Sequence, residues 1–300
     1  MGIGIDLEPV TIGTSGLGKR PGADARVARA MLESPLAQLD TSNNYALGET
    51  ERLLGAALDE AGGLPAGKVV FSKIDQDPET GVFDYDRAMR SFEETRGRLH
   101  LDTLPLLHLH DPYTITVAEG LGKGGPVEAL LRLKEEGLVG AIGIAAGTRA
   151  LVEEYVRSGV FDAVLTHNRY TLVERSGLGI IEAAAERGMT VFNAAPFGGG
   201  ILAGSAFRGQ QYAYQPASDD LASWIDRLHA LCAAHGLDVA AVALAFSMRE
   251  PRIHSTVVGV YSLERVEALP GLAAAAAGIP TGFWDELETE LGTPPATPAD

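Results

Sequence analysis

Short runs of β-branched and other apolar residues alternate along the chain with longer segments whose apolar residues recur with helical spacing. The short runs are typical of buried strands, and the longer segments are typical of amphipathic helices. The predicted strands are residues 10–17, 36–42, 68–74, 104–111, 140–146, 161–168, 190–197 and 254–260. The predicted helices are residues 23–34, 49–62, 85–100, 126–138, 149–159, 177–188, 223–236 with 238–250, and 262–272.

Eight successive strand–helix units, with no change of composition between them, predict a closed (β/α)8 barrel (a TIM barrel) in one α/β domain. The strands are apolar along their length, as expected of parallel strands covered on both faces. Glycines after predicted helices are expected to end them in the left-handed conformation: Gly62, Gly63, Gly137, Gly159, Gly188 and Gly236. The barrel is predicted to cover residues 1–291, and the Pro- and Thr-rich tail 292–300 is expected to be disordered.

The composition narrows the range of partners. The chain has 24 Lys and Arg against 40 Asp and Glu, a net charge of −16, so nucleic acid is not expected as a partner. The single cysteine, Cys232, allows no intrachain disulfide, which suits a reducing compartment. No apolar stretch reaches about 18 residues, so no membrane span is expected. Residues 1–10 do not resemble a signal peptide, and we expect a cytoplasmic protein whose oligomeric state the sequence does not indicate.

Catalytic residues of a TIM barrel lie at the carboxyl ends of its strands, which gives a short list of candidates. Lys73 ends an otherwise apolar strand, and Asp40 ends the preceding one. A lone buried ammonium is costly, so Lys73 either points outward or is paired with Asp40 inside the barrel mouth. Tyr45 follows in the loop after Asp40; a free tyrosine has a pKa of about 10, and a nearby ammonium would lower it. Taken alone, Tyr45 is better explained as a loop aromatic packed on a helix.

Two histidines lie near the end of the fourth predicted strand, in "LHLHDPY". His108 and His110 are two residues apart and therefore face the same side. His110 is nearer the strand end, where a neutral imidazole could orient a substrate oxygen, and His108 is interpreted as a core residue one layer deeper. A zinc site on this pair would need a third ligand at suitable spacing, and we expect no metal.

These positions together resemble the aldo-keto reductase superfamily over nearly the whole chain. The matching stretches are "LDTSNNYALGETERLLGAAL", "VVFSKI", "LPLLHLHDP", "KEEGLVGAIGIA", "NRYTLVER", "FNAAPFGGGILA" and "VVGVYSLERVEA". Within the superfamily, "LHLHDP" and "FNAAPFGGGIL" are most similar to the L-fucose, L-galactose and D-threo-aldose 1-dehydrogenase group, with pyridoxal 4-dehydrogenase as a relative.

The resemblance implies an NAD(P)-dependent oxidoreductase acting on a small-molecule substrate. Tyr45 would be the general acid and base, Lys73 would lower the pKa of Tyr45, Asp40 would hold Lys73, and His110 would orient the substrate oxygen. Hydride would pass between C4 of nicotinamide and, in the aldose dehydrogenases, the anomeric carbon of the sugar, giving a lactone.

Several cofactor positions differ from the common family pattern. Ala145 and Ala146 replace a Ser-Asn pair, His167 replaces a glutamine, and Ala194 replaces the aromatic that stacks on nicotinamide. The residues left to contact the cofactor, as the resemblance implies, are His167, Asn168, Asn193, Pro196, Phe197, Gly198, Gly259, Ser262 and Arg265. NADP-preferring members commonly have a lysine at the position of Gly259, so we expect NAD, with NADP use possible.

The substrate and the enzyme class have alternatives. A pyridoxal-like hemiacetal or a simple aldehyde could replace the aldose. The aromatic residues that could line the pocket, or only anchor loops, are Tyr113, Phe197, Phe207, Tyr212 and Tyr214. A Schiff-base aldolase would use Lys73 as nucleophile, and a nucleotide-sensing subunit would keep cofactor binding but turn over poorly.

Overall fold

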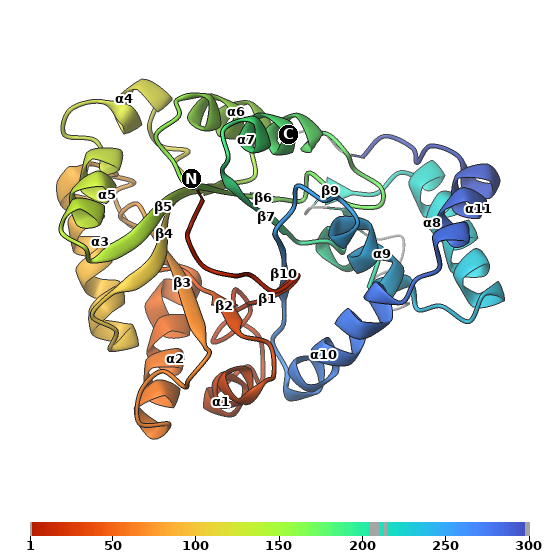
Figure 1. Cartoon of the computed structure of the whole chain (residues 1–300), viewed down its shortest axis with the longest axis horizontal. Coiled ribbons are helices and arrows are strands. Elements are labelled where there is room, and N and C mark those ends of the chain that lie inside the picture. Colours follow the sequence, from red (N-terminus) through yellow and green to blue (C-terminus); the bar gives the residue numbers. More distant parts are fainter. Residues whose placement is uncertain (1, 204–210, 213–214, 298–300) are drawn as a thin grey trace.

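Eight parallel strands close into a barrel in the computed structural model, which describes residues 2–203, 211–212 and 215–297 (Figure 1). The strands follow the order β1–β10–β7–β6–β5–β4–β3–β2, so neighbours in sequence are neighbours in the barrel. They are β1 (Val10–Gly13), β2 (Gln38–Asp40), β3 (Val69–Ile74), β4 (Leu104–His110), β5 (Val139–Ala146), β6 (Ala163–His167), β7 (Thr190–Ala194) and β10 (Ser255–Gly259). The predicted (β/α)8 barrel is confirmed.

The helices surround the barrel as the alternating pattern predicts. They are α1 (Ala25–Glu33), α2 (Glu49–Glu60), α3 (Tyr85–Leu99), α5 (Pro126–Glu135), α6 (Arg149–Arg157), α7 (Leu178–Glu186), α8 (Asp219–Ala234), α9 (Val239–Met248) and α10 (Leu263–Ala277). Several begin at a polar cap, such as Asp24, Asp84 and Asp238, whose carboxylates accept from backbone N–H groups of the first turn. All six glycines expected to end helices have positive φ.

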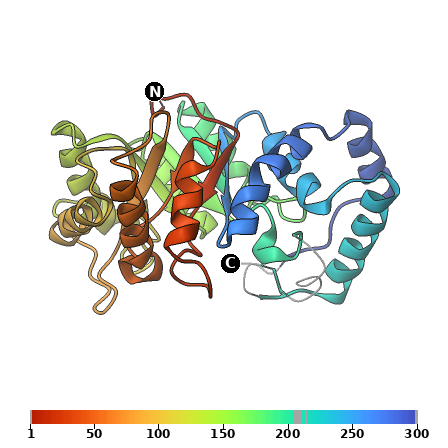
Figure 2. The ribbon, with the colours of Figure 1, turned by 90° about the horizontal axis from the view of Figure 1, so that it is seen from below.

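Some elements were not predicted. Helix α4 (Val117–Leu121) begins with a capping box of Thr116 and Glu119, and α11 (Thr281–Leu291) packs against α8 at one side of the barrel (Figures 1 and 2). A small sheet joins β8 (Gln211–Tyr212) to β9 (Gln215–Pro216). Helix α10 continues through Pro270 to Ala277, beyond its predicted end, because a run of alanines follows the proline.

The barrel interior is closed at the amino ends of the strands. Alternate residues of the strands, among them Phe71, Leu106 and Phe192, pack together inside, and Ile3 and Ile5 of the N-terminal segment join them. This segment runs across the barrel in Figure 1 and lies at one end of it in Figure 2. The backbone N–H of Ile3 donates to Thr190 at the start of β7, 3.2 Å away. The carboxyl ends of the strands therefore form the mouth of the barrel.

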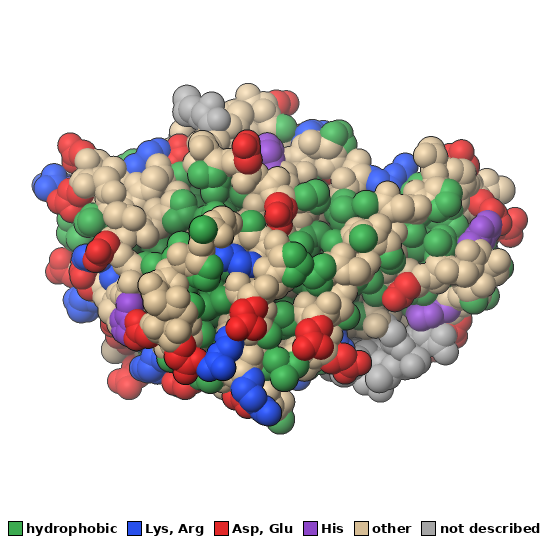
Figure 3. All heavy atoms as spheres, turned by 60° about the horizontal axis from the view of Figure 1, so that its bottom comes forward, with side chains coloured by type: hydrophobic (Ala, Val, Ile, Leu, Met, Phe, Trp, Pro, Cys, Tyr) green, Lys and Arg blue, Asp and Glu red, His purple; other side chains and the backbone are tan. Residues whose placement is uncertain are grey.

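The surface mixes charges of both signs. On the face shown in Figure 3, Lys and Arg side chains are interspersed with Asp and Glu. No single helix of the described ranges is long and apolar enough to cross a membrane, although α8 and α9 together, bent by 99°, would pass by length and composition. Residues 292–297 of the tail have no helix or strand, and the hydroxyl of Thr297 donates to Glu174; residues 298–300 lie outside the described residues.

The contact between α2 and α3 depends on Gly55. A Cβ at this position would lie 1.8 Å from the carbonyl oxygen of Arg98, whereas a Cβ at the exposed Gly97 of α3 meets no other described atom within 4 Å. Gly55→Ala is expected to lower the free energy of unfolding by about 2 kcal/mol or more through overpacking. Gly97→Ala, the matched control, is expected to raise it by about 0.5–1 kcal/mol. Urea denaturation measures both, and equal effects would contradict this packing.

Candidate active site

Lys73, Asp40 and Tyr45 meet at the mouth of the barrel. The ammonium of Lys73 is buried, with 1% of the residue exposed, so the side chain does not point outward. Its Nζ donates to Asp40 Oδ2 at 2.7 Å, to the carbonyl oxygen of Thr41 at 2.6 Å and to the hydroxyl of Tyr45 at 3.2 Å. An ammonium has three N–H donors, and here all three are satisfied.

Burial and electrostatic attraction have opposite effects on the pKa values of Lys73 and Tyr45. Burial would lower the pKa of Lys73, but the attraction to Asp40 and Tyr45 outweighs it and raises that pKa, so Lys73 is an ammonium. Burial raises the pKa of Tyr45 to about 12, although Lys73 opposes this shift. The expected net lowering of the Tyr45 pKa is therefore wrong for this structure. The sequence showed the cation beside Tyr45 but not how deeply the phenol is buried.

The turn after Tyr45, which contacts Lys73, has an unusual backbone. Three successive residues have left-handed backbones, Ala46 with φ 50°, Leu47 with φ 54° and Gly48 with φ 87°. The first two are strained, because residues with a Cβ rarely adopt this conformation. The φ of Gly48 favours glycine, and a Cβ there would lie 2.4 Å from Cζ of Arg98, so the Arg98 side chain would have to move.

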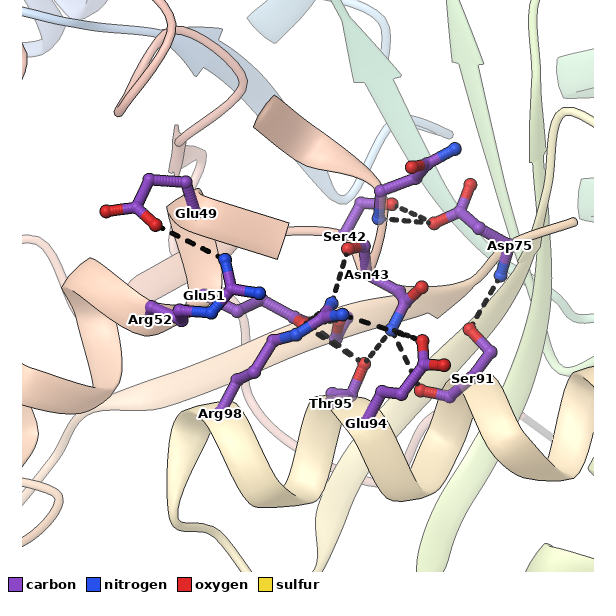
Figure 4. A network of polar contacts seen from close by, with 12 residues as sticks. Ser42, Asn43, Glu49, Glu51, Arg52, Asp75, Ser91, Glu94, Thr95 and Arg98 are labelled. Carbon is purple, nitrogen blue, oxygen red and sulfur yellow. Dashed lines mark hydrogen bonds and ion pairs between the residues drawn. The ribbon is translucent and has the colours of Figure 1, made fainter. Parts of the chain in front are cut away.

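A buried polar network holds this loop against α3 (Figure 4). The amide of Asn43 donates to the carbonyl oxygen of Ser91 and accepts from Arg87, both at 3.0 Å. Arg98 donates to the carbonyl oxygen of Asn43 at 2.8 Å and lies 3.4 Å from the carboxylate of Glu51, which has no exposed surface. The loop that carries Tyr45 is therefore anchored by charged hydrogen bonds behind it.

His110 is oriented by a residue that the sequence analysis missed. Its Nδ1 lies 2.7 Å from Asp75 Oδ1 and 2.9 Å from Ser42 Oγ, and Ser42 donates to the other oxygen of Asp75 at 2.5 Å. The ring packs edge-on against Tyr45, with centroids 5.6 Å apart. Burial would lower the pKa of His110, but Asp75 outweighs it and raises that pKa, which favours the imidazolium over the neutral ring expected from sequence.

The position of Asp75 could have been recognised from its spacing in the sequence. It follows Lys73 by two positions, so strand alternation places both on the inner face. The predicted strand ended at residue 74, which left Asp75 out of the candidates.

His108 is the core residue that was expected. It lies one layer below His110, fully inside, and burial lowers its pKa well below the ordinary value, so it is neutral. A Cβ on Gly143 of the next strand would lie 2.2 Å from His108 Nδ1, so this glycine makes room for the ring. Within the described ranges no group of three or more His, Cys, Asp or Glu residues could hold a metal ion.

The residues expected to meet the nicotinamide end of the cofactor divide into two sets. His167 ends β6 at the mouth, and Asn168 Nδ2 lies 3.2 Å from His167 Nδ1. Asn193 points away from the mouth, because Phe192 faces the interior and the alternation turns Asn193 outward. Its amide donates to the carbonyl oxygen of Tyr170 at 2.7 Å and to Ser247 at 2.8 Å. Asn193 is therefore corrected from a cofactor residue to a link between β7 and α9.

The remaining candidates lie after β7 and β10. Pro196, Phe197 and Gly198 form the turn after β7; a Cβ on Gly198 would lie 2.5 Å from the ring of Tyr212. The hydroxyl of Tyr212 donates to the carbonyl oxygen of Asn168 at 2.8 Å, so Tyr212 anchors the loop. Phe207 and Tyr214 lie outside the described residues. Tyr113 is half-exposed, and its hydroxyl accepts from the N–H of Gly147.

Two arginines, Arg265 and Arg20, lie near the residues that follow β10. Ser262 caps α10 by accepting from the N–H of Arg265 at 3.4 Å, and Gly259 is exposed at the end of β10. The guanidinium of Arg265 lies 4.9 Å from the ring centroid of Tyr261, and Arg20 of the β1–α1 loop lies 5.5 Å from the same ring. Arg20 was missed because only its position in the fold connects it to the last helix.

The chain is similar in sequence and in fold to known oxidoreductases. The sequence pattern of the aldo/keto reductase family matches residues 9–281. D-threo-aldose 1-dehydrogenase of Pseudomonas sp is 30% identical, covering 87% of this chain and 85% of that protein. Pyridoxal 4-dehydrogenase of Microbacterium luteolum is 27% identical, covering 96% and 95%, and L-galactose dehydrogenase of Arabidopsis thaliana is 26% identical, covering 88% and 83%. An aldo-keto reductase from Bacillus halodurans, solved in its holo form, shares the fold with a TM-score of 0.76 over 97% of this chain and 94% of that chain, at 18% identity.

Asp75 is predicted to control the protonation of His110. In Asp75→Asn, the loss of the carboxylate should lower the pKa of His110, because the attraction that raises it is removed. Titration of the ring by NMR measures this shift, with the exposed Asp86→Asn as a control for the change in net charge. An unchanged His110 pKa in Asp75→Asn would contradict the assigned contact.

Glu51 is predicted to make stability depend on pH. Burial raises the pKa of its carboxyl from 4.5 to about 7, against the opposing effects of Ser72 and Thr95. Folding therefore takes up a proton; the stabilising contribution is complete below the unfolded pKa and is lost as the pH rises through the folded one. Glu51→Gln removes this dependence.

The unfolding free energy of Glu51→Gln relative to the wild type should accordingly rise by roughly 2–4 kcal/mol between about pH 4.5 and pH 8. Urea denaturation at several pH values across this range measures the difference in unfolding free energy between the two proteins. The contributions of the other titrating groups cancel in this difference. A constant difference would show that Glu51 does not titrate as described.

Proposed function

Because the chain belongs to the aldo/keto reductase family, we propose that this NAD(P)-dependent oxidoreductase is an aldose 1-dehydrogenase. It oxidises the anomeric carbon of a sugar of the L-fucose, L-galactose or D-threo-aldose type to a lactone. The observation that carries the proposal is the buried contact of Lys73 with both Asp40 and Tyr45, beside a His110 held by Asp75. The names of two relatives, D-threo-aldose 1-dehydrogenase and L-galactose dehydrogenase, support the substrate class.

The four residues divide the proton chemistry among them. Tyr45 accepts the proton of the anomeric hydroxyl as a phenolate and returns it, as a phenol, in the reverse direction. Lys73, 3.2 Å from the phenol oxygen, stabilises the phenolate, and Asp40 keeps Lys73 in place. His110 uses Nδ1 for Asp75, so Nε2 is available to donate a hydrogen bond to the substrate oxygen.

The mouth has polar groups suited to a nicotinamide cofactor, which supplies the hydride acceptor when bound. Asn168 Oδ1 is buried and has no hydrogen-bond partner in the part of the chain that the structure describes, so it is free for the amide N–H of a carboxamide. Arg20, Arg265 and the capped start of α10 supply positive charge for the adenosine end. Gly259 offers no side chain for a 2′-phosphate, so we propose NAD as the preferred cofactor, with NADP use possible.

The alternatives are less well supported. A Schiff-base aldolase needs a neutral amine as nucleophile, but Asp40 and Tyr45 keep Lys73 as an ammonium. A nucleotide-sensing subunit need not retain a complete set of catalytic residues, whereas all four lie together here. Pyridoxal 4-dehydrogenase is the second candidate, because the relative with that name is 27% identical over 96% of this chain.

Tyr45→Phe tests the proposal. Without the phenol hydroxyl, kcat should fall by about 10²–10⁴-fold, the usual contribution of a general acid or base. Formation of reduced nicotinamide would be followed by absorbance with NAD or NADP and L-fucose, L-galactose, D-arabinose, pyridoxal and simple alcohols. Tyr85→Phe, at the start of α3, is the matched control and should keep wild-type activity.

The panel also separates the substrates. Oxidation of one aldose, lost in Tyr45→Phe, is the expected result. Turnover of pyridoxal alone would favour the second candidate. Full aldose activity in Tyr45→Phe would contradict the assigned acid and base.

A further inference from the structure

Asp111 places a carboxylate at the barrel mouth, next to the catalytic histidine but outside the four catalytic residues. It follows His110 at the end of β4, and its Oδ2 lies 3.6 Å from His110 Nε2, the nitrogen available to the substrate. Its Oδ1 lies 3.7 Å from Nε2 of His167, which ends β6. The carboxylate therefore lies between two imidazoles from two different strands, and both distances are longer than a hydrogen bond.

The backbone at Asp111 is held in a strained conformation. Its φ of 41° is in the left-handed region, which a residue with a Cβ rarely adopts. The conformation is fixed on both sides: the N–H of Asp111 donates to the carbonyl oxygen of Ala145 at 2.9 Å, and its own carbonyl accepts from Tyr113 at 2.7 Å. Strain of this kind persists where the surrounding structure enforces it, often at ligand sites.

The carboxylate has an unused acceptor. Oδ1 is buried and has no hydrogen-bond partner among the residues that the structure describes, although 36% of the side chain is exposed. Burial would raise the pKa of Asp111, but His167, His110 and Tyr113 outweigh it and lower that pKa to about 2, so the group is ionised at neutral pH. A buried carboxylate oxygen without a donor is costly, and a ligand hydroxyl would satisfy it.

We propose that Asp111 is a specificity-determining residue that accepts a hydrogen bond from a substrate hydroxyl adjacent to the reacting carbon. His110 Nε2 binds the reacting oxygen, and the neighbouring hydroxyl then lies beside the carboxylate. The site selects neutral polyhydroxy substrates: those without the hydroxyl leave Asp111 unsatisfied, and those with an anionic group there are repelled. The inference rests on the proposed function, because it concerns the same mouth and the same reacting oxygen.

Two aldehydes of equal carbon number isolate this contact. Glyceraldehyde carries a hydroxyl beside the carbonyl, and 3-hydroxypropanal lacks only that hydroxyl. The measured quantity is the ratio of kcat/KM for glyceraldehyde to that for 3-hydroxypropanal, with reduced nicotinamide cofactor. In the wild type we expect this ratio to exceed about tenfold, the effect of a hydrogen bond to a charged group.

The variants keep the backbone in place. Asn tolerates a left-handed conformation, so Asp111→Asn removes the charge without disturbing the turn, and Asp111→Gly removes the side chain and the strain together. Both should lower the ratio by about tenfold, mainly through a higher KM for glyceraldehyde. The control is Asp102→Asn, before the start of the same strand, where the side chain is fully exposed at 100% and its loss should leave the ratio unchanged.

The outcomes distinguish this inference from the proposed function. If the wild type turns over no aldose in the panel but its glyceraldehyde ratio still falls in Asp111→Asn, the proposed substrate is wrong and the role of Asp111 holds. If aldoses are oxidised but the ratio is the same in the wild type, Asp111→Asn and Asp111→Gly, the proposed function stands and this inference is overturned. A wild type that prefers 3-hydroxypropanal also overturns it.

Discussion

The ion pair of Lys73 with Asp40 is the interaction on which the rest of the mouth depends. An ammonium inside a barrel is tolerated only when it is paired and its hydrogen bonds are made. Asp40, the Thr41 carbonyl and the Tyr45 hydroxyl take its three donors, so the position of Nζ is fixed and the phenol is fixed with it. Because β2 and β3 are neighbouring strands, the barrel brings the two charges together without any further element.

The loops at the barrel mouth contain strained residues, and the loop after β2 is held by hydrogen bonds to α3. Among the residues that the structure describes, six have a Cβ and positive φ, and five of these follow the carboxyl end of a strand: Ala46, Leu47, Asp111, Asn168 and Ala195. The first two are held by Asn43, Arg98 and the network that reaches α3 (Figure 4). A rigid barrel with anchored loops keeps the reacting groups in position, which is the main contribution of a protein to hydride transfer by a cofactor.

Much of this arrangement was predictable from the sequence, for identifiable reasons. The alternation of strands and helices determined the barrel, and the rule that chemistry lies at strand ends selected Asp40, Tyr45, Lys73 and His110. The resemblance then supplied their roles. Asn193 was misplaced because strand-end position was used without the alternation that turns it outward. Asp75 was missed because it lies one residue beyond the end of the strand, in the prediction and in the structure alike. The upward pKa shift of Tyr45 depends on burial, which no sequence pattern shows.

The central claim is that Lys73 stabilises the ionised form of Tyr45 against the effect of burial. The most direct test is the pH dependence of the hydride-transfer step, measured as a single turnover by stopped flow in the wild type and in Lys73→Met. Loss of the ammonium leaves Asp40 unpaired, and both changes raise the pKa of Tyr45. The account predicts that the rate of substrate oxidation rises at a higher pH in Lys73→Met than in the wild type. The same pH midpoint in both proteins would contradict it.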